Sequence, residues 1–216
     1  MSDHPPYNPL DKKNLGASVA EALLEREVHP LGALKKVTGA GIYAIYYTGG
    51  FPAYAPLAAR NEGGRFTAPI YVGKAIPSGG RKGRERTIGS IEWPLYKRLG
   101  EHAKSIGSAP SLRIEDFHCR FLVVDDIWIP LGESLLIAKF APVWNSIVDG
   151  FGNHTPGKGR FEGLRPRWDT LHPGRSWALK CPERVETPDQ IISDVQHHLR
   201  SLPLLFKPIL HEGGES

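Results

Sequence analysis

GIYAIYYT (residues 41–48) and PIYVG (residues 69–73) are two short runs rich in β-branched and aromatic residues, and glycine bounds both of them. Such composition and length are typical of β-strands, and the polar stretch between the runs indicates a long loop. We expect the two strands to pair. A third strand is expected at FHCRFLVV (117–124). The sequence therefore predicts a small, mainly antiparallel sheet of about three strands.

Helices are predicted on both sides of these strands. The segment WPLYKRLGEHAKSIG (93–107) is expected to form an amphipathic helix that stops at its last glycine. Further helices are expected at about 16–26, 130–140 and 188–201, the last of them after the capping-box sequence TPDQ (187–190). The fold class is α/β, with the small sheet flanked by helices. The apolar stripe of the 93–107 helix comprises Trp93, Tyr96, Leu99, Ala103 and Ile106.

The length of 216 residues and a hydrophobic content of 40% are enough for one compact domain with a real core. Within it we expect an N-terminal arm and helix (1–40), a core (41–147) and a loop-rich and helical C-terminal extension (148–216), with residues 1–14 as a poorly ordered arm. No apolar run approaches membrane-spanning length and the N-terminus has no apolar signal region, so we expect a cytoplasmic protein without membrane contact.

Cys119 and Cys181 are too few for a disulfide framework or a Cys-rich zinc site, and core packing is expected for both. The net charge of +4 is a mild excess that many enzymes share, but basic residues cluster locally. A solvated basic face and a nucleic-acid contact both fit this clustering. The first cluster contains Arg81, Lys82, Arg84 and Arg86, and the second contains Lys158, Arg160, Arg165, Arg167 and Arg175.

Five polar side chains could together hydrolyse a phosphodiester bond: Tyr43, Tyr71, Arg98, His102 and Glu133. The reaction needs a deprotonated water, positive groups near the phosphoryl oxygens and help for the departing oxygen. The two tyrosines could point to one face of adjacent strands. Arg98 and His102 are one helical turn apart, and we expect them on a flank of their helix rather than on its Tyr96/Leu99 stripe. Taken singly, each residue could equally serve packing, surface charge or helix capping.

The order of these residues resembles the GIY-YIG nuclease family. The triplet GIY (41–43) is followed by YVG (71–73), then by R-x-x-x-H (98–102), by Glu133 and by P-x-W-N (142–145). Val72 stands where the family name has isoleucine, which exchanges one β-branched residue for another. Beyond this core, 148–161 and 172–181 are similar to the type II restriction endonucleases of this family that cut CCGCGG.

The resemblance implies a role for each residue of the set. Tyr43 would act as the general base on water, with His102 accepting or relaying its proton, because an unassisted phenol is a poor base at neutral pH. Arg98 would stabilise the pentacovalent phosphate, and Tyr71 would bind the scissile phosphate or the attacking water. Glu133 would ligate a single Mg²⁺, which Mn²⁺ could replace. Asn145 would support the site, and Lys74 is either a phosphate contact or a solvated strand end.

The same resemblance implies a bacterial enzyme that leaves 5′-phosphate and 3′-hydroxyl ends, with a cognate DNA methyltransferase as its genetic partner. A palindromic site in double-stranded DNA would be matched by a homodimer. Two alternatives stay open: a non-catalytic DNA-binding module on a nuclease core, and a P-loop NTPase. The second arises because GFGNHTPGKG (150–159) nearly spells a Walker loop, although Gly159 stands where Ser or Thr is required. The residues expected to contact DNA are Arg81, Lys82, Arg84, Arg86, Asn153, His154, Lys158 and Arg160.

Overall fold

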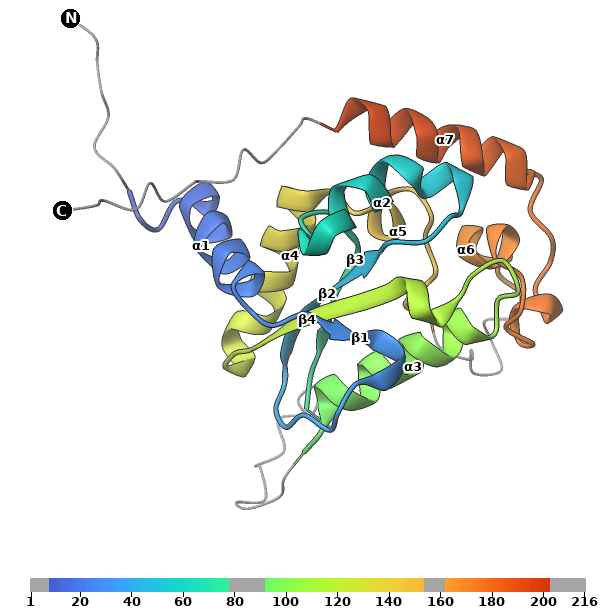
Figure 1. The fold of residues 1–216 in the computed structure, drawn as a ribbon. Helices are drawn as coiled ribbons and strands as arrows, with labels where there is room; N and C mark the ends of the chain where they lie inside the picture. The colour runs from blue at the N-terminus through green and yellow to red at the C-terminus, as the bar shows by residue number, and fades with distance from the viewer. Residues whose placement is uncertain (1–7, 78–91, 154–161, 203–216) are drawn as a thin grey trace, which may run out of the picture.

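The computed structural model describes residues 8–77, 92–153 and 162–202. Within them lies one antiparallel sheet of four strands in the order β1-β4-β2-β3 (Figure 1). The three predicted strands are confirmed as β2 (Gly41–Tyr47), β3 (Pro69–Ala75) and β4 (Phe117–Val123). The additional strand, β1 (His29–Pro30), was not predicted. Two residues, one of them a proline, are too few to show the alternation by which a strand is recognised.

Strands β2 and β3 pair as expected, and their register sets the geometry of the site. Tyr43 is paired with Gly73, and Ile45 is paired with Tyr71. Paired residues of an antiparallel ladder point to the same face of the sheet. Tyr43 and Tyr71 therefore lie on one face. Strand β2 is buried along its whole length because it is central and both faces are covered, which explains its nearly continuous apolar sequence.

The longer helices are α1 (Lys12–Leu24), α3 (Pro94–Gly107), α4 (Ile129–Phe140) and α7 (Pro188–Ser201). All four were predicted, and the capping box of α7 is present, with Thr187 and Gln190 bonding each other's backbone N–H. Helix α1 begins earlier than predicted because its first turn is polar and shows no periodicity, so the arm prediction is wrong for residues 12–14. In the described residues, no helix is both long and apolar enough to cross a bilayer.

Shorter helices occupy segments that were predicted as loops. The stretch between β2 and β3 contains α2 (Ala55–Asn61), and the C-terminal third contains α6 (Arg167–Leu171), while α5 (Val143–Ser146) follows α4. Such short helices lack the two full turns from which a period can be read. Turns of 3₁₀ helix lie at Leu31–Ala33, Pro52–Tyr54, Glu62–Gly64, Ile114–Asp116, Asp126–Trp128 and Ala178–Lys180.

The two faces of the sheet are covered by different helices (Figure 1). Helices α1 and α4 pack on one face, where Leu23 and Leu136 belong to a cluster with Ile42 and Val72. Helices α3, α5, α6 and α7 supply the cluster on the other face, which includes Tyr43 and Tyr71. Segments from all three expected parts of the chain thus share one core. Cys119 and Cys181 are buried and free, which confirms the packing prediction.

The buried stripe of α3 differs from the predicted one. It consists of Leu95, Leu99, His102 and Ile106. Trp93, Tyr96 and Ala103 are only partly buried. The prediction that His102 lies on a helix flank is therefore wrong. Apolar residues alone defined the predicted stripe, and a histidine that is buried through a specific partner does not enter such a pattern.

Candidate active site

The centre of the site is a hydrogen bond between a strand and a helix. Strand β2 directs Tyr43 toward α3, and the buried stripe of α3 presents His102 to it. The Tyr43 hydroxyl oxygen lies 2.7 Å from His102 Nε2, with 0% and 2% of the two residues exposed. In the tautomer that leaves Nε2 without a proton, the tyrosine donates and the imidazole accepts. The arrangement can pass a proton from the phenol to the ring.

Tyr71 and Arg98 adjoin this pair. The Tyr71 ring lies 5.2 Å from the His102 ring and 6.3 Å from the Tyr43 ring. One helical turn before His102, Arg98 pairs with Glu101 at 3.0 Å, and its side chain is 20% exposed. Glycine is required at 73 because an added Cβ would lie 2.4 Å from the Tyr43 hydroxyl oxygen. Four of the five predicted catalytic residues thus come together on the α3 face.

Burial and charge act in opposite directions on the two phenols. Burial raises the pKa of Tyr43 well above its ordinary value, Tyr71 and Glu133 raise it further, and Arg98 lowers it. The pKa of Tyr71 is also raised, first by burial and then by Glu133, again against Arg98. A phenolate is therefore costly at this position without an acceptor for its proton. The His102 nitrogen bonded to Tyr43 is such an acceptor.

Glu133 approaches from the α4 side of the sheet. Gly132 lets α4 lie close to β2, since a Cβ there would be 3.1 Å from Ile42. The Glu133 carboxylate forms an ion pair of 2.6 Å with Lys74 Nζ, and its side chain is 18% exposed. This ion pair was not predicted, and a phosphate contact by Lys74 stays a prediction. The charge of this carboxylate raises the pKa of both tyrosines.

Glu133 is the residue of the predicted set that could hold a metal ion. Its carboxylate already faces a cation, the ammonium of Lys74, so its position suits a positive charge. In the described part of the chain, no three His, Cys, Asp or Glu side chains gather as a metal-binding group. Mg²⁺ is commonly held by one or two carboxylates together with waters and substrate phosphate oxygens. A single glutamate fits that mode of binding, with the remaining ligands coming from water and substrate.

Asn145 supports strand β3, which carries Tyr71 and Lys74. Its side-chain Oδ1 accepts from the Val72 N–H and its Nδ2 donates to the Val72 carbonyl, both at 2.8 Å. Strand β3 is at the edge of the sheet, where such groups would otherwise lack a strand partner. The amide therefore fixes the backbone that separates Tyr71 from Gly73.

Two residues that the sequence reasoning assigned elsewhere also touch the site. The Phe151 ring stacks on His102 at 4.5 Å with an interplanar angle of 19° and meets Tyr71 edge to face at 5.0 Å. The Gly152 carbonyl accepts a hydrogen bond of 2.7 Å from Arg98. Both belong to the GFGN sequence, which was expected to lie in a segment that contacts DNA or a partner chain, or that forms a Walker-like loop. Helix α5 and a turn precede it, whereas a P-loop follows a strand.

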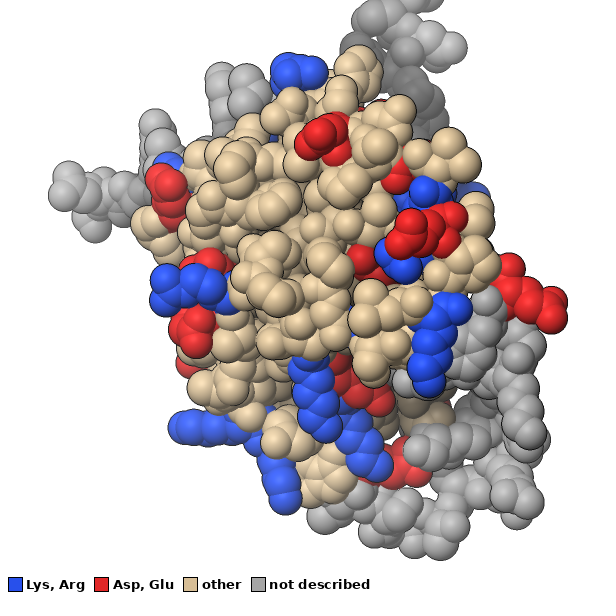
Figure 2. All heavy atoms as spheres, turned by 90° about the vertical axis from the view of Figure 1, so that its right-hand side faces the viewer, with Lys and Arg blue, Asp and Glu red and all other residues tan. Residues whose placement is uncertain are grey.

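Most of the residues expected to contact DNA lie outside the described ranges. These are Arg81, Lys82, Arg84, Arg86, His154, Lys158 and Arg160. Asn153 is described and is exposed, directly after the two residues that touch the site. On the face drawn in Figure 2, basic and acidic side chains are interspersed over a largely uncharged surface.

Other arginines of the second basic cluster have acidic partners within the chain. Arg165 pairs with Glu183 at 3.4 Å, and Arg167 pairs with Glu186 at 3.1 Å and with Asp194. These two side chains therefore fasten the C-terminal segments to one another.

The sequence matches one family model over residues 35–199, and that model is described as the Eco29kI GIY-YIG domain. The matched range includes every residue of the candidate site. None of the curated proteins compared with the chain matches it.

Proposed function

The chain belongs to the Eco29kI GIY-YIG family of restriction endonucleases, and on this premise we propose that it is a type II enzyme cutting duplex DNA at a palindromic site with Mg²⁺. Membership makes it a nuclease, and therefore a hydrolase that acts on DNA. The proposal adds site specificity, with CCGCGG as the candidate sequence, and 5′-phosphate and 3′-hydroxyl products.

The observation that carries the chemical proposal is the 2.7 Å contact between the Tyr43 hydroxyl and His102 Nε2. As a water molecule attacks phosphorus, its proton passes to the Tyr43 oxygen while the phenolic proton passes to His102. The new bond is P–O from water, and the bond that breaks is P–O3′. This relay avoids a free phenolate, which burial disfavours by raising the Tyr43 pKa.

Arg98 and Glu133 are more accessible than Tyr43 to a phosphate that arrives from solvent. Tyr43 is fully buried, whereas 20% of the Arg98 side chain and 18% of the Glu133 side chain are exposed. Arg98 then offsets the charge that develops on the phosphoryl oxygens, and the Tyr71 hydroxyl donates to the phosphate. The Gly152 carbonyl and Glu101 hold the guanidinium in place before DNA arrives.

Glu133 supplies the carboxylate for one Mg²⁺, or for Mn²⁺ in its place. When bound there, the ion would offset charge on the leaving 3′ oxygen. Lys74 neutralises the same carboxylate in its absence, because the two side chains form an ion pair. A bound ion would compete with Lys74 for this carboxylate, and a released ammonium would be free to contact a DNA phosphate.

A palindromic target calls for two active sites related by a twofold axis, hence a homodimer on DNA. Base and phosphate contacts are assigned to the basic segments 77–92 and 148–167. A cytoplasmic location in bacteria and a cognate DNA methyltransferase complete the proposal, because a site-specific nuclease would otherwise cut its host's DNA.

The experiment is digestion of a plasmid of known sequence with Mg²⁺, followed by sequencing of the ends. We expect all ends to map to one palindrome, and Glu133→Gln to bind the same site without cutting it. Glu21→Gln, on the exposed surface of α1, is the control and should cut like the parent. Ends scattered over the plasmid, or cutting by Glu133→Gln at the parental rate, would contradict the proposal. The binding-module alternative predicts no cutting, and the NTPase alternative predicts a requirement for ATP.

A further inference from the structure

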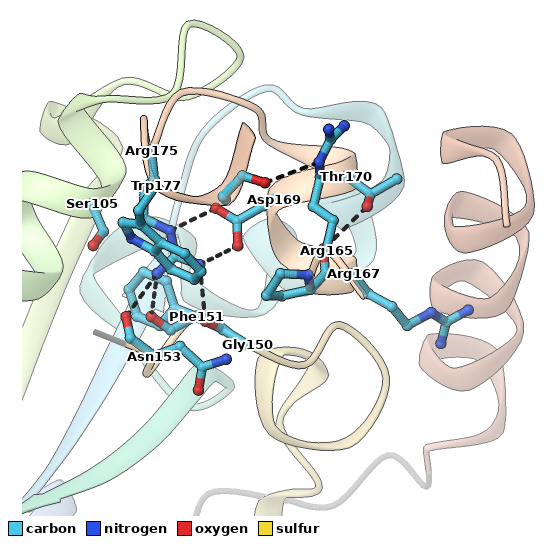
Figure 3. A network of polar contacts seen from close by, with 12 residues as sticks. Ser105, Gly150, Phe151, Asn153, Arg165, Arg167, Asp169, Thr170, Arg175 and Trp177 are labelled. Carbon is cyan, nitrogen blue, oxygen red and sulfur yellow. Dashed lines mark hydrogen bonds and ion pairs between the residues drawn. The ribbon is translucent and has the colours of Figure 1, made fainter. Parts of the chain in front are cut away.

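Arg175 is buried next to the segment 150–153 and uses every N–H of its guanidinium. Nε donates to Asp169 at 2.7 Å, and one Nη2 hydrogen donates to the same carboxylate. The other Nη2 hydrogen goes to the Gly150 carbonyl at 2.9 Å. The Nη1 hydrogens go to the carbonyls of Phe151 and Asn153, both at 3.1 Å. Figure 3 shows these contacts fanning out from one side chain.

Two indole rings enclose the same guanidinium. Its central carbon lies 4.6 Å from the Trp168 ring and 4.8 Å from the Trp177 ring. A planar guanidinium can stack on aromatic rings while its edge donates five hydrogen bonds. Lysine has three donors and no plane, so it cannot reproduce this set. Position 175 therefore requires arginine and not only a positive charge.

The segment that Arg175 holds is the one that touches the catalytic candidates. Phe151 stacks on His102, and the Gly152 carbonyl accepts from Arg98. The backbone of this segment packs closely against the site, since a Cβ on Gly152 would lie 2.6 Å from the Tyr71 hydroxyl oxygen. The backbone at Gly150 has φ +93°, a conformation that glycine adopts readily. A small displacement of this backbone would therefore move His102 and Arg98.

We propose that Arg175, held by Asp169, is a positioning residue for cleavage: it fixes residues 150–153 so that Phe151 and the Gly152 carbonyl hold His102 and Arg98 in their reactive geometry. Arg175 acts through this segment and does not itself touch DNA or the reacting atoms. The inference rests on the proposed nuclease mechanism. The proposed role explains why a buried ion pair holds the segment 150–153, which directly precedes residues that are expected to contact DNA.

The first test is Arg175→Lys, with the single-turnover cleavage rate and DNA affinity measured separately. Affinity is measured with Ca²⁺ in place of Mg²⁺. We expect a rate loss of about 100-fold, the size that misplaced catalytic groups can cause, with affinity nearly unchanged. Arg120→Lys is the matched control. Arg120 is also buried and donates to the backbone carbonyls of Arg26 and Phe66, away from the site. An equal rate loss in both variants, or none in Arg175→Lys, would overturn the proposal.

The second test does not depend on activity. The Phe151 ring shields the His102 ring protons, so their NMR signals should move downfield in Arg175→Lys and stay in place in Arg120→Lys. Signals of His29, which stacks on Phe121 at the opposite edge of the sheet from β3, provide the internal reference. A rate loss without this shift, or the shift without a rate loss, would refute the proposed route through 150–153. A parent protein that cuts no DNA would refute the nuclease mechanism, while the NMR comparison would still test the structural link.

Phe151→Leu keeps the inference testable if Arg175→Lys fails to fold. Leucine retains most of the apolar contact but cannot stack on His102. We expect the same downfield shift and a smaller rate loss, of about tenfold. If Arg175→Lys does fold, it should add less than its full effect to Phe151→Leu, because both changes act on one contact. Parental cleavage in Phe151→Leu would overturn the proposal.

Discussion

Two buried tyrosine–histidine pairs lie in the core on the α3 side of the sheet. Tyr43 and His102 are joined at 2.7 Å, and Tyr54 and His172 are joined at 2.8 Å, in both cases through the histidine Nε2. All four side chains are almost fully buried. The local hydrogen bond is therefore nearly the same in the two places. Their surroundings are different.

The neighbours that hydrogen-bond to Tyr54 and His172 are neutral groups. Trp144 Nε1 donates to the Tyr54 hydroxyl at 2.9 Å, and Ser111 lies 2.9 Å from His172 Nδ1. Burial lowers the pKa of His172 to about 3 and raises that of Tyr54, so both stay neutral. Tyr43, by contrast, has Arg98 and Glu133 as charged neighbours. We infer that charge and access to a phosphate, rather than the tyrosine–histidine bond, separate a reactive pair from a structural one.

Removing one hydroxyl from each pair should give the largest contrast. Tyr43→Phe is expected to lower the single-turnover cleavage rate by about 10²–10⁴-fold, the range for loss of general acid–base catalysis. Tyr54→Phe, measured at a temperature where it is folded, should cut like the parent. Comparable rates in the two variants would show that the charged surroundings do not matter. Tyr46→Phe, on the opposite face of β2, controls for loss of a buried hydroxyl from that strand.

A methyl group at Gly73 should disturb only the first pair. The Cβ of Gly73→Ala would lie 2.4 Å from the Tyr43 oxygen, so the ring must move relative to His102. We expect cleavage to fall by about 100-fold. Gly100→Ala is the matched control, since its Cβ meets nothing within 4 Å on α3, and it should retain activity. If Gly73→Ala cuts normally, the contact between Tyr43 and His102 does not require its present geometry.

The pH dependence of stability should report the second pair. His172 has a folded-state pKa of about 3 against 6.5 for the free side chain, so below pH 6.5 the unfolded chain binds a proton that the folded chain does not. Stability is then intact above about pH 6.5 and falls by about 1.4 kcal/mol per pH unit toward pH 3. Urea unfolding at about pH 6.5 and about pH 5 should show a loss about 2 kcal/mol greater in the parent than in His172→Gln. Equal losses would mean that His172 protonates in the folded protein.

The smallest expected effect is the stability cost of Tyr54→Phe. Loss of this hydroxyl leaves the buried Trp144 N–H and His172 Nε2 without their partner. We expect the free energy of unfolding to fall by about 1–3 kcal/mol, as measured by urea titration. A neutral substitution would indicate that water replaces the hydroxyl. Together with the cleavage assay, this result would show that Tyr54 contributes to stability and not to chemistry.

Local sequence determined much of the fold. The β-branched and aromatic composition of 41–48 and 69–73 gave the paired strands, and the TPDQ capping box gave the start of α7. The ordered motif set marked Tyr43, Tyr71, Arg98, His102 and Glu133, because residue type and spacing are visible in one dimension. Short elements such as β1 and α2 were missed, since fewer than two periods carry no pattern.

Tertiary structure decided which of these residues touch. The His102 side chain lies on the buried stripe of α3 because Tyr43 satisfies its nitrogen, and only the fold brings the two together across 59 residues of chain. Arg175 was interpreted as one member of a basic cluster, yet its hydrogen bonds are all internal. The sequence shows only that residue 175 carries a positive charge. Whether that charge faces DNA or fixes a loop depends on which carbonyls and carboxylates the folded chain places around it.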